Sequence, residues 1–353
     1  MSRRLRILVL ANARFPITQP FAGGLESWTW SLVHGLRRRG IEVTIFAGAG
    51  SDLKLGAVAL VPKPVSLSDA ARADVSMPPH AWMQEHHAYL QAMMYALHGN
   101  AGFDVVHNAS LHYLPLTFAG ALPMPMLTTL HTPPTPWLES AIQLAASDVH
   151  LVAVSDHTAR AWSHLACPQV IPNGIDLGAW PFGNGGDALV WSGRLVPEKA
   201  PHHAAMIARA AGMPLRIAGP VIDPSYFNVR VKPLLGDGVE YIGHLAQPEL
   251  SRLVGSSAAS LVTPNWDEPY GLVVAESLAS GTPVCAYRRG GIVELIDEEC
   301  GRRVRPGDVE AAAAGVREAV TLDRRAARRR AEQCCSIDAM LDAYCATYRR
   351  LVS

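Results

Sequence analysis

The stretch Trp266-Asp267-Glu268-Pro269-Tyr270-Gly271-Leu272-Val273-Val274-Ala275-Glu276 joins the end of an apolar run to the start of an apolar helix. The run before it, residues 260–263, has the length and composition of a buried strand. Pro269 suits the first helical position, where its missing N–H is not needed. We therefore expect a strand at 260–263, a helix at 269–280 and Glu268 as the helix N-cap.

The same strand–helix unit recurs along the whole chain. Further buried strands are expected at residues 5–11, 43–47, 105–107, 126–130, 151–154, 189–192, 215–218, 239–242 and 283–286. Further helices are expected at 25–39, 136–147, 157–166, 201–211, 248–254, 309–322 and 337–351. Regular alternation of this kind predicts an α/β protein whose parallel sheets are covered on both faces.

A stretch rich in turn formers, from Pro172-Asn173-Gly174-Ile175-Asp176 to residue 186, predicts a linker between two halves. At 353 residues the chain is long enough for two such domains. We expect a first Rossmann-like domain at 1–172, a second at 173–335, and a final amphipathic helix at 336–353.

Composition narrows the class of protein further. Thirty-one basic residues balance thirty-one acidic ones, which argues against a nucleic-acid partner. The six cysteines form no CxxC pair, so reduced thiols and a cytoplasmic location are expected. The first apolar run, residues 7–11, is too short for a signal peptide or a membrane span.

Two loops at strand ends carry features suited to phosphate. Ligands bind outside the carboxyl ends of parallel strands, and there Arg194 and Lys199 follow the strand at 189–192. A guanidinium and an ammonium can share the charge of a diphosphate, although two solvated loop charges are the simpler alternative. Gly23 and Gly24 open the first helix, which lets the backbone approach a phosphate, unless they form an ordinary turn. The chain has no GxGxxG after its first strand and no GxxxxGK, which disfavours a dinucleotide dehydrogenase and a P-loop NTPase.

The spacing of the two glutamates in the opening stretch suggests which ligand would carry that diphosphate. On one helix, Glu276 would lie two turns beyond Glu268, about 12 Å along the axis at ~1.5 Å per residue. The N–H groups of Gly271 and Leu272 lie between them. A sugar nucleotide has hydroxyls at both ends and a diphosphate in the middle, so it would fit this arrangement. In the alternative interpretation, Glu268 only caps the helix and Glu276 is an exposed helical carboxylate.

Histidines are numerous, and one has a suggestive place. His131 directly follows the strand at 126–130, where it would point across the cleft between the domains, although a structural role is more common for a histidine. The pairs His86-His87 and His202-His203 have no partners at metal-ligand spacing. We expect them to be surface or packing residues and expect no metal site.

Taken together, these motifs resemble the retaining GT-B glycosyltransferases of family GT4. The E-x7-E spacing of Glu268 and Glu276 is the most specific match. In the family's order, the chain has GGLE at 23–26, His131, PNGID at 172–176, GRLVPEK at 193–199, GHL at 243–245, EPYGLVVAE at 268–276 and SLASGTPV at 277–284. Its AGGLE and WDEPYGLV sequences look closest to the AviGT4-like branch.

The resemblance implies a GT-B fold, in which two facing Rossmann-like domains enclose the active site and the final helix packs back on the first domain. It implies a nucleotide diphosphate sugar as donor, with UDP-glucose expected, and retention without a metal or cofactor by front-face attack. The roles that it implies are diphosphate binding by Arg194, Lys199, Gly24, Gly271 and Leu272; ribose binding by Glu276; orientation of the donor sugar by Glu268; proximity to the base for His244 and Leu245; and proximity to the reacting carbon for His131.

The acceptor, a hydroxyl of a small molecule or glycan, is expected to contact the first domain at residues 15–21, 73–99 and 110–113. No carboxylate in the first half stands out as a nucleophile for double displacement. The arginine-rich run 324–330 is interpreted as a solvated helix face rather than a membrane patch, so membrane contact is not favoured. A sugar-nucleotide epimerase or phosphorylase of the same fold, and a non-catalytic sugar-nucleotide sensor, stay open as alternatives.

Overall fold

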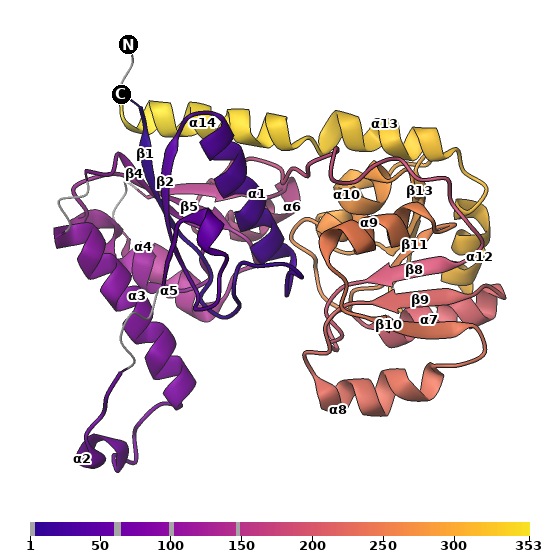
Figure 1. The fold of residues 1–353 in the computed structure, drawn as a ribbon, viewed down its shortest axis with the longest axis horizontal. Helices are drawn as coiled ribbons and strands as arrows, with labels where there is room; N and C mark the ends of the chain where they lie inside the picture. Colours follow the sequence, from indigo (N-terminus) through magenta and orange to yellow (C-terminus); the bar gives the residue numbers. More distant parts are fainter. Residues whose placement is uncertain (1–3, 60–64, 99–101, 146–148) are drawn as a thin grey trace.

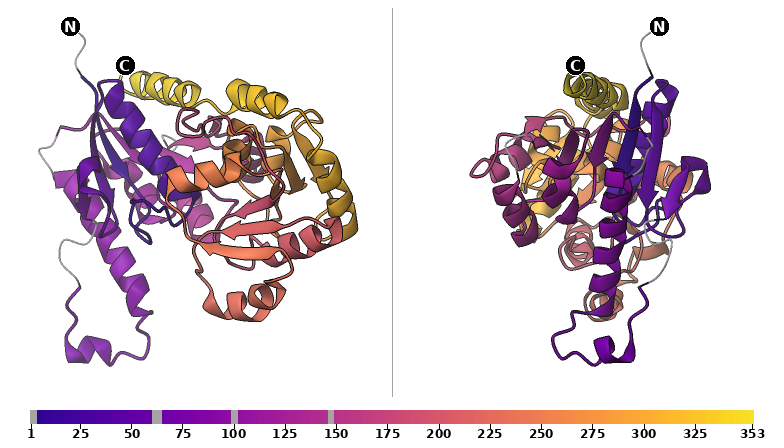
Figure 2. Two further views of the ribbon diagram at one scale, coloured as in Figure 1. Left: turned by 45° about the vertical axis from the view of Figure 1, so that its right-hand side comes forward. Right: turned by 90° about the vertical axis from the view of Figure 1, so that its left-hand side faces the viewer.

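The computed structural model describes residues 4–59, 65–98, 102–145 and 149–353. The chain forms two lobes, each built on one sheet, with two helices running along one side of both lobes (Figures 1 and 2). Every strand pair within the described residues is parallel. The carboxyl ends of the strands therefore share one edge in each lobe, and ligand sites are expected there.

The first lobe is a seven-stranded sheet in the order β3-β2-β1-β4-β5-β6-β7. Its strands are β1 (Arg6–Leu10), β2 (Glu42–Ala47), β3 (Ala57–Ala59), β4 (Val105–Asn108), β5 (Met126–Leu130), β6 (His150–Ala153) and β7 (Gln169–Val170). Its helices are α1 (Gly24–Arg38), α2 (Asp69–Arg72), α3 (His80–His98), α4 (Leu114–Phe118), α5 (Pro136–Leu144) and α6 (Asp156–Trp162).

The second lobe is a six-stranded sheet in the order β10-β9-β8-β11-β12-β13. Its strands are β8 (Leu189–Ser192), β9 (Leu215–Ala218), β10 (Val239–Gly243), β11 (Ser260–Val262), β12 (Val284–Tyr287) and β13 (Gly301–Val304). Its helices are α7 (Pro201–Ala211), α8 (Pro224–Tyr226), α9 (Gln247–Gly255), α10 (Leu272–Ala279), α11 (Ile292–Leu295), α12 (Val309–Ala319) and α13 (Arg324–Cys334).

The last helix, α14 (Ile337–Leu351), belongs to the core of the first lobe although it follows the second in sequence. Leu341, Tyr344 and Tyr348 are fully buried against the first sheet and α1. His107 of β4 hydrogen-bonds the Tyr348 hydroxyl at 2.7 Å and Thr129 of β5 at 2.8 Å. Burial lowers the pKa of His107 to about 3, so this buried link is neutral.

The chain crosses between the lobes twice at one point. Ile175, on the way out, pairs in parallel with Ser336, on the way back. The Ile175 N–H donates to the Cys335 carbonyl at 2.9 Å, and the Ile337 N–H donates to the Ile175 carbonyl at 3.1 Å. The two linkers thus lie side by side at one point between the lobes.

Most strands lie within a residue or two of their expected positions, and β5, β8, β9, α7 and α14 have the expected bounds. The short edge strands β3 and β7, the strand β13 and the helix α3 were not predicted as elements, and α13 was expected only as a helix face over residues 324–330. α3 carried a usable signal, because its buried residues recur at helical spacing: Ala88, Tyr89, Ala92, Met93 and Ala96. Residues 146 and 147 of the expected helix 136–147 lie outside the described residues.

The helix of the opening stretch was placed wrongly. α10 begins at Leu272, and Glu268 is not its N-cap. Gly271 takes that place with a φ of 100°, a left-handed conformation that interrupts a helix and favours glycine. Other groups hold the loop before it: the Pro269 carbonyl accepts from the Ser155 hydroxyl of the first lobe at 2.5 Å, and the Glu268 carbonyl from the Gly291 N–H at 2.7 Å. Glu276 therefore lies in the second turn of α10, and the two glutamates do not share a helix face.

The arginine-rich run is neither a fully solvated face nor a basic patch. Arg324 donates to the carbonyls of Gly183, Ser257, Gly255 and Ser280, at 2.9–3.3 Å. Arg328 and Arg330 of α13 likewise donate to carbonyls, at distances from 2.7 Å to 3.4 Å. Several of these carbonyls terminate helices, where a cation is favoured. Arg325 and Arg329 alone point outward.

Candidate active site

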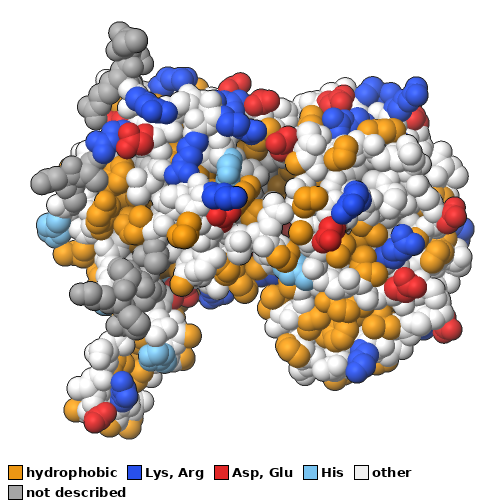
Figure 3. Space-filling view, in the orientation of Figure 1, with side chains coloured by type: hydrophobic (Ala, Val, Ile, Leu, Met, Phe, Trp, Pro, Cys, Tyr) orange, Lys and Arg blue, Asp and Glu red, His pale blue; other side chains and the backbone are white. Residues whose placement is uncertain are grey.

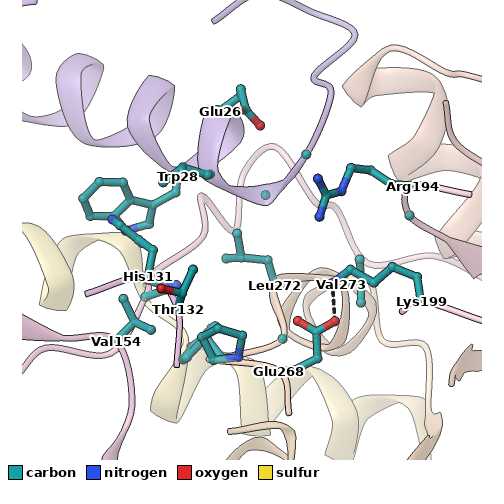
Figure 4. Close-up of a pocket in the computed structure, with 18 of the residues that line it drawn as sticks. Glu26, Trp28, His131, Thr132, Val154, Arg194, Lys199, Glu268, Leu272 and Val273 are labelled. Atoms are coloured by element: carbon teal, nitrogen blue, oxygen red, sulfur yellow. Dashed lines mark hydrogen bonds and ion pairs between the residues drawn. The ribbon is translucent and has the colours of Figure 1, made fainter. Parts of the chain in front are cut away.

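A cavity of about 260 Å³ lies between the lobes, lined from both sides. It contains the loops that follow β1 and β5 in the first lobe and β8 and β11 in the second. Figure 3 shows charges of both signs spread over the visible face and a hollow between the lobes. Figure 4 shows the cavity in close-up, with Glu26 and Glu268 on opposite sides of it.

The second lobe supplies the ionic wall of this cavity. The Lys199 ammonium forms an ion pair with the Glu268 carboxylate. The Trp266 indole N–H donates to the same carboxylate oxygen at 3.1 Å, and Lys199 lies 5.2 Å from the centre of the Trp266 ring. Glu268 is buried, so these contacts fix its orientation and offset its charge. Arg194 also lines the wall and lies 3.7 Å from Glu198.

The first lobe supplies a wall in which the aromatic pair His131 and Trp28 lies beside two charged side chains, Arg14 and Glu26. His131 follows β5 and lines the cavity, and its ring meets the Trp28 ring of α1 edge-on at 4.4 Å between centroids. Among the described residues, no partner hydrogen-bonds its buried Nε2 atom. Burial lowers the pKa of His131 to about 3, so the ring is neutral. A neutral imidazole with a free nitrogen can hydrogen-bond a hydroxyl of a bound molecule.

Two helices begin at the same place in the cavity. A methyl group on Gly24, the first residue of α1, would lie only 2.9 Å from Leu272 Cδ1 at the start of α10. The first N–H groups of a helix have no intrahelical partner, and its N-terminus carries partial positive charge. With Arg194 and Lys199 beside them, these two termini make a strongly anion-attracting region.

A second cavity, of about 110 Å³, adjoins the first and also contacts Gly24, Arg194 and Leu272. Its wall includes His244, Leu245 and Glu276. His244 hydrogen-bonds the Phe21 carbonyl of the first lobe at 2.9 Å, which closes this cavity across the lobes. Burial raises the pKa of Glu276 to about 8, so at neutral pH its carboxyl group is mainly protonated.

The structure thus brings the sequence-predicted residues together in two adjoining cavities. His131, Glu268, Lys199 and Gly271 line the first, His244, Leu245 and Glu276 line the second, and Gly24, Arg194 and Leu272 line both. Trp28, Trp266, Asn12 and Glu26 also line the larger cavity and were not predicted as site residues. Trp266 had a signal, because it immediately precedes the Asp267-Glu268 pair. Glu26 had one too, as the acidic residue that follows the two glycines in the first turn of a helix.

Other candidate groups have structural roles. The buried His202 contacts the Tyr226 hydroxyl at 2.6 Å, and His203 contacts the Tyr287 hydroxyl at 3.2 Å. His86 contacts the Tyr113 hydroxyl at 3.3 Å. In the described part of the chain, no three His, Cys, Asp or Glu side chains gather as a metal site. All six cysteines are free thiols.

Comparison with known proteins agrees with this geometry. The family model Glycosyltransferase Family 4 matches residues 22–179, and the model Glycosyl transferases group 1 matches residues 179–333. The chain belongs to glycosyltransferase family 4. It is therefore a glycosyltransferase, and its two facing parallel-sheet domains are the GT-B fold.

Among curated relatives, the chain is 28% identical to a glycogen synthase of Mycobacterium tuberculosis, over 92% of this chain and 74% of that protein. It is also 28% identical to a D-inositol 3-phosphate glycosyltransferase of Mycobacterium avium, over 98% of this chain and 94% of that protein. The two names differ in the molecule that receives the sugar.

Two solved structures share the fold over almost the whole chain. AviGT4, a glycosyltransferase involved in avilamycin A biosynthesis, aligns with a TM-score of 0.73 and 22% identity, covering 99% of this chain and 98% of that one. Anabaena Alr3699/HepE, in complex with UDP-glucose, aligns with a TM-score of 0.75 and 18% identity, covering 99% of this chain and 100% of that one. No described helix of the glycosyltransferase is long and apolar enough to cross a membrane.

Proposed function

We propose that this glycosyltransferase transfers a glucosyl or related hexosyl group from a UDP-sugar, expected to be UDP-glucose, to an acceptor hydroxyl with retention of configuration. The observation that carries the proposal is the shared cavity, where two helix N-termini, Arg194 and Lys199 face one anion position and Glu268 lies at its edge. A nucleotide diphosphate sugar has a charged diphosphate next to a neutral sugar, in the same order as these contacts along the cavity. The complexes of Alr3699/HepE with UDP and with UDP-glucose support the choice of nucleotide.

The donor would extend through both cavities. The base and ribose fit the smaller one, with the base beside His244 and Leu245 and the ribose hydroxyls at Glu276. The diphosphate would lie at the junction, on Arg194, Lys199, Gly24 and the first turn of α10. The sugar would then enter the larger cavity between Glu268 and His131.

The charges support a transfer without a metal. As the bond from the anomeric carbon to the diphosphate breaks, negative charge builds on the leaving oxygen. Arg194, Lys199 and the two helix termini are already in place to stabilise it. The acceptor oxygen attacks the same face of the sugar, and its proton passes to the departing phosphate oxygen.

Double displacement has a weaker basis in this cavity. Glu26 is a carboxylate of the first lobe, which the sequence analysis did not single out as a possible nucleophile. It lies beside Gly23 and Arg194, at the diphosphate position rather than at the sugar position. Trapping of a covalent glycosyl-enzyme would contradict front-face attack.

The acceptor is proposed to be a hydroxyl of a small molecule or glycan bound by the first lobe. The loop after β1 brings Asn12, Arg14 and Phe15 to the larger cavity, and the loop after β4 brings Leu111. These residues lie opposite the ionic wall. An incoming hydroxyl would therefore meet the donor sugar from this side.

A donor screen by thermal shift tests the proposal. A ligand at 100 times its dissociation constant stabilises the folded protein by about 2.7 kcal/mol. We expect UDP and UDP-sugars, UDP-glucose above all, to raise the melting temperature more than GDP-mannose does. Incubation of the preferred donor with an acceptor panel, followed by NMR of the anomeric proton, gives the stereochemistry.

The product also separates the rival activities. An epimerised nucleotide sugar formed without acceptor would indicate an epimerase, and strict dependence on phosphate a phosphorylase. Binding of UDP-sugars without transfer or hydrolysis would indicate a sensor. Each of these results would contradict transfer.

A further inference from the structure

One buried carboxylate of the larger cavity has no part in the proposed reaction. Glu26 lies in the first turn of α1 and is 4% exposed. A buried carboxylate is unfavourable unless partners offset its charge. Burial raises the pKa of Glu26, while hydrogen bonds from its own backbone N–H and the Asn12 side chain, and the charge of Arg194, act in the opposite direction.

Arg194 of the other lobe lies near this carboxylate, and the ion pair that it forms is with Glu198 of its own lobe. Both side chains approach the backbone of Gly23, the residue before α1. A methyl group on Gly23 would lie 3.1 Å from Glu26 Oε2, 3.7 Å from Arg194 Cδ and 3.9 Å from Arg194 Nε. Figure 4 shows Arg194 extending from the second lobe toward the start of α1, where Glu26 lies. The two side chains thus flank Gly23 from opposite lobes, close enough for their charges to interact.

This position creates an electrostatic problem that Arg194 can solve. The proposed donor brings a diphosphate to the N-terminus of α1, beside Glu26. A carboxylate there repels the diphosphate unless a cation lies between them. A guanidinium has five N–H donors in a planar fork, so it can bond a carboxylate on one edge and a phosphate on another.

We propose that Glu26 is a positioning residue that holds the Arg194 guanidinium across the cleft, at the N-terminus of α1, ready for the donor diphosphate. This inference rests on the proposed function. Its consequence is that the first lobe takes part in donor binding through a second-lobe residue. Glu26 itself need not touch the sugar or the acceptor.

A double-mutant cycle tests the coupling. The dissociation constant of UDP is measured by calorimetry for the full chain and for Glu26→Gln, Arg194→Lys and the double variant. We expect Glu26→Gln to weaken UDP binding about tenfold, because the amide keeps the shape but not the charge. In the Arg194→Lys background, where the fork is absent, the same change should weaken UDP binding less than twofold.

Controls keep the outcome clear. Glu310→Gln makes the same substitution in the first turn of another helix, α12, on an exposed side chain, and should leave UDP affinity unchanged. An equal loss from Glu26→Gln in both backgrounds would overturn the positioning role, because it would show that Glu26 acts independently of Arg194. Arg194→Ala provides a second background with the same expectation. If the unmodified chain bound no UDP at all, the proposed function itself would fail, whereas additive effects in a chain that binds UDP would remove this inference alone.

Discussion

The two walls of the larger cavity differ in kind. The second lobe presents ions in pairs, Lys199 with Glu268 and Arg194 with Glu198. The first lobe presents a neutral pair, the His131 ring against Trp28, called the neutral wall below, beside the charged side chains Arg14 and Glu26. An ionic wall suits a charged donor whose position must be fixed, whereas a neutral wall leaves the choice of acceptor to shape and hydrogen bonds.

The strongest test of this contrast is to remove the ionic wall's central cation. Lys199→Met should reduce kcat/KM for transfer by about 100-fold or more, because breaking a buried pair leaves Glu268 uncompensated and removes a diphosphate ligand, worth roughly 3 kcal/mol. Steady-state kinetics with UDP-glucose measures the effect. Lys232→Met, an exposed lysine on the same lobe, is the control. A loss below fivefold would show that the pair has no role in donor use.

The next test separates the two glutamates. Glu268→Ala should lower kcat about 100-fold while UDP affinity stays within about threefold, since it faces the sugar. Glu276→Ala should weaken UDP and every UDP-sugar about tenfold, because it removes hydrogen bonds to the ribose hydroxyls that are each worth about 0.5–1.5 kcal/mol. Calorimetry with UDP and initial rates provide both numbers. Equal loss of UDP affinity in the two variants would contradict the division of roles.

The neutral wall is expected to respond more weakly. His131→Ala should lower kcat about tenfold through the loss of one hydrogen bond of about 1–1.5 kcal/mol, with UDP affinity unchanged. Because burial lowers the pKa of His131 to about 3, His131 should not titrate between pH 5 and pH 8. The pH profile of kcat/KM should therefore have the same shape in the unmodified chain and in His131→Ala. His98→Ala, an exposed histidine at the end of α3, is the comparison. An inflection near pH 6.5 that depends on His131 would mean that the wall carries charge.

The last prediction concerns stability rather than rate. Burial raises the pKa of Glu276 to about 8, above the value near 4.5 of a free side chain. Between these two values the unfolded chain loses the proton and the folded chain keeps it, so stability falls as pH rises, by at most about 1.4 kcal/mol per pH unit. Glu276→Gln should therefore melt close to the unmodified chain at pH 5 and above it at pH 8. Glu240→Gln, on an exposed side chain, reports the effect of the substitution alone. A constant difference in melting temperature from pH 5 to pH 8 would argue against a buried proton on Glu276.

Sequence patterns located the ionic wall well for a physical reason. Arg194 and Lys199 lie in one short loop after a strand, and the edge of a parallel sheet fixes where such a loop goes. The strand positions followed from apolar runs in the same way. The left-handed Gly271 could not be foreseen, because nothing in EPYG excludes continuation of a helix from Pro269.

The neutral wall was harder to anticipate. Trp28 and His131 are 103 positions apart in the sequence, and their contact depends on α1 packing over the end of β5. The role of α13 was misjudged for a related reason. The local sequence does not tell an arginine that donates to carbonyl groups from an arginine that points into water. Only the packing of α10 and the loops distinguishes Arg324 from Arg325.

The return of α14 to the first lobe also sets an order of events during synthesis. Residues 176–335 leave the ribosome before Leu341, Tyr344 and Tyr348, which the core of the first lobe requires. The second lobe can therefore complete its core first, while the lobe made earlier waits with an uncovered apolar face on α1. For this chain, we expect the usual order, in which the amino-terminal domain folds first, to be reversed. Nascent chains stalled just after Cys335 should resist protease in the second lobe and not in the first.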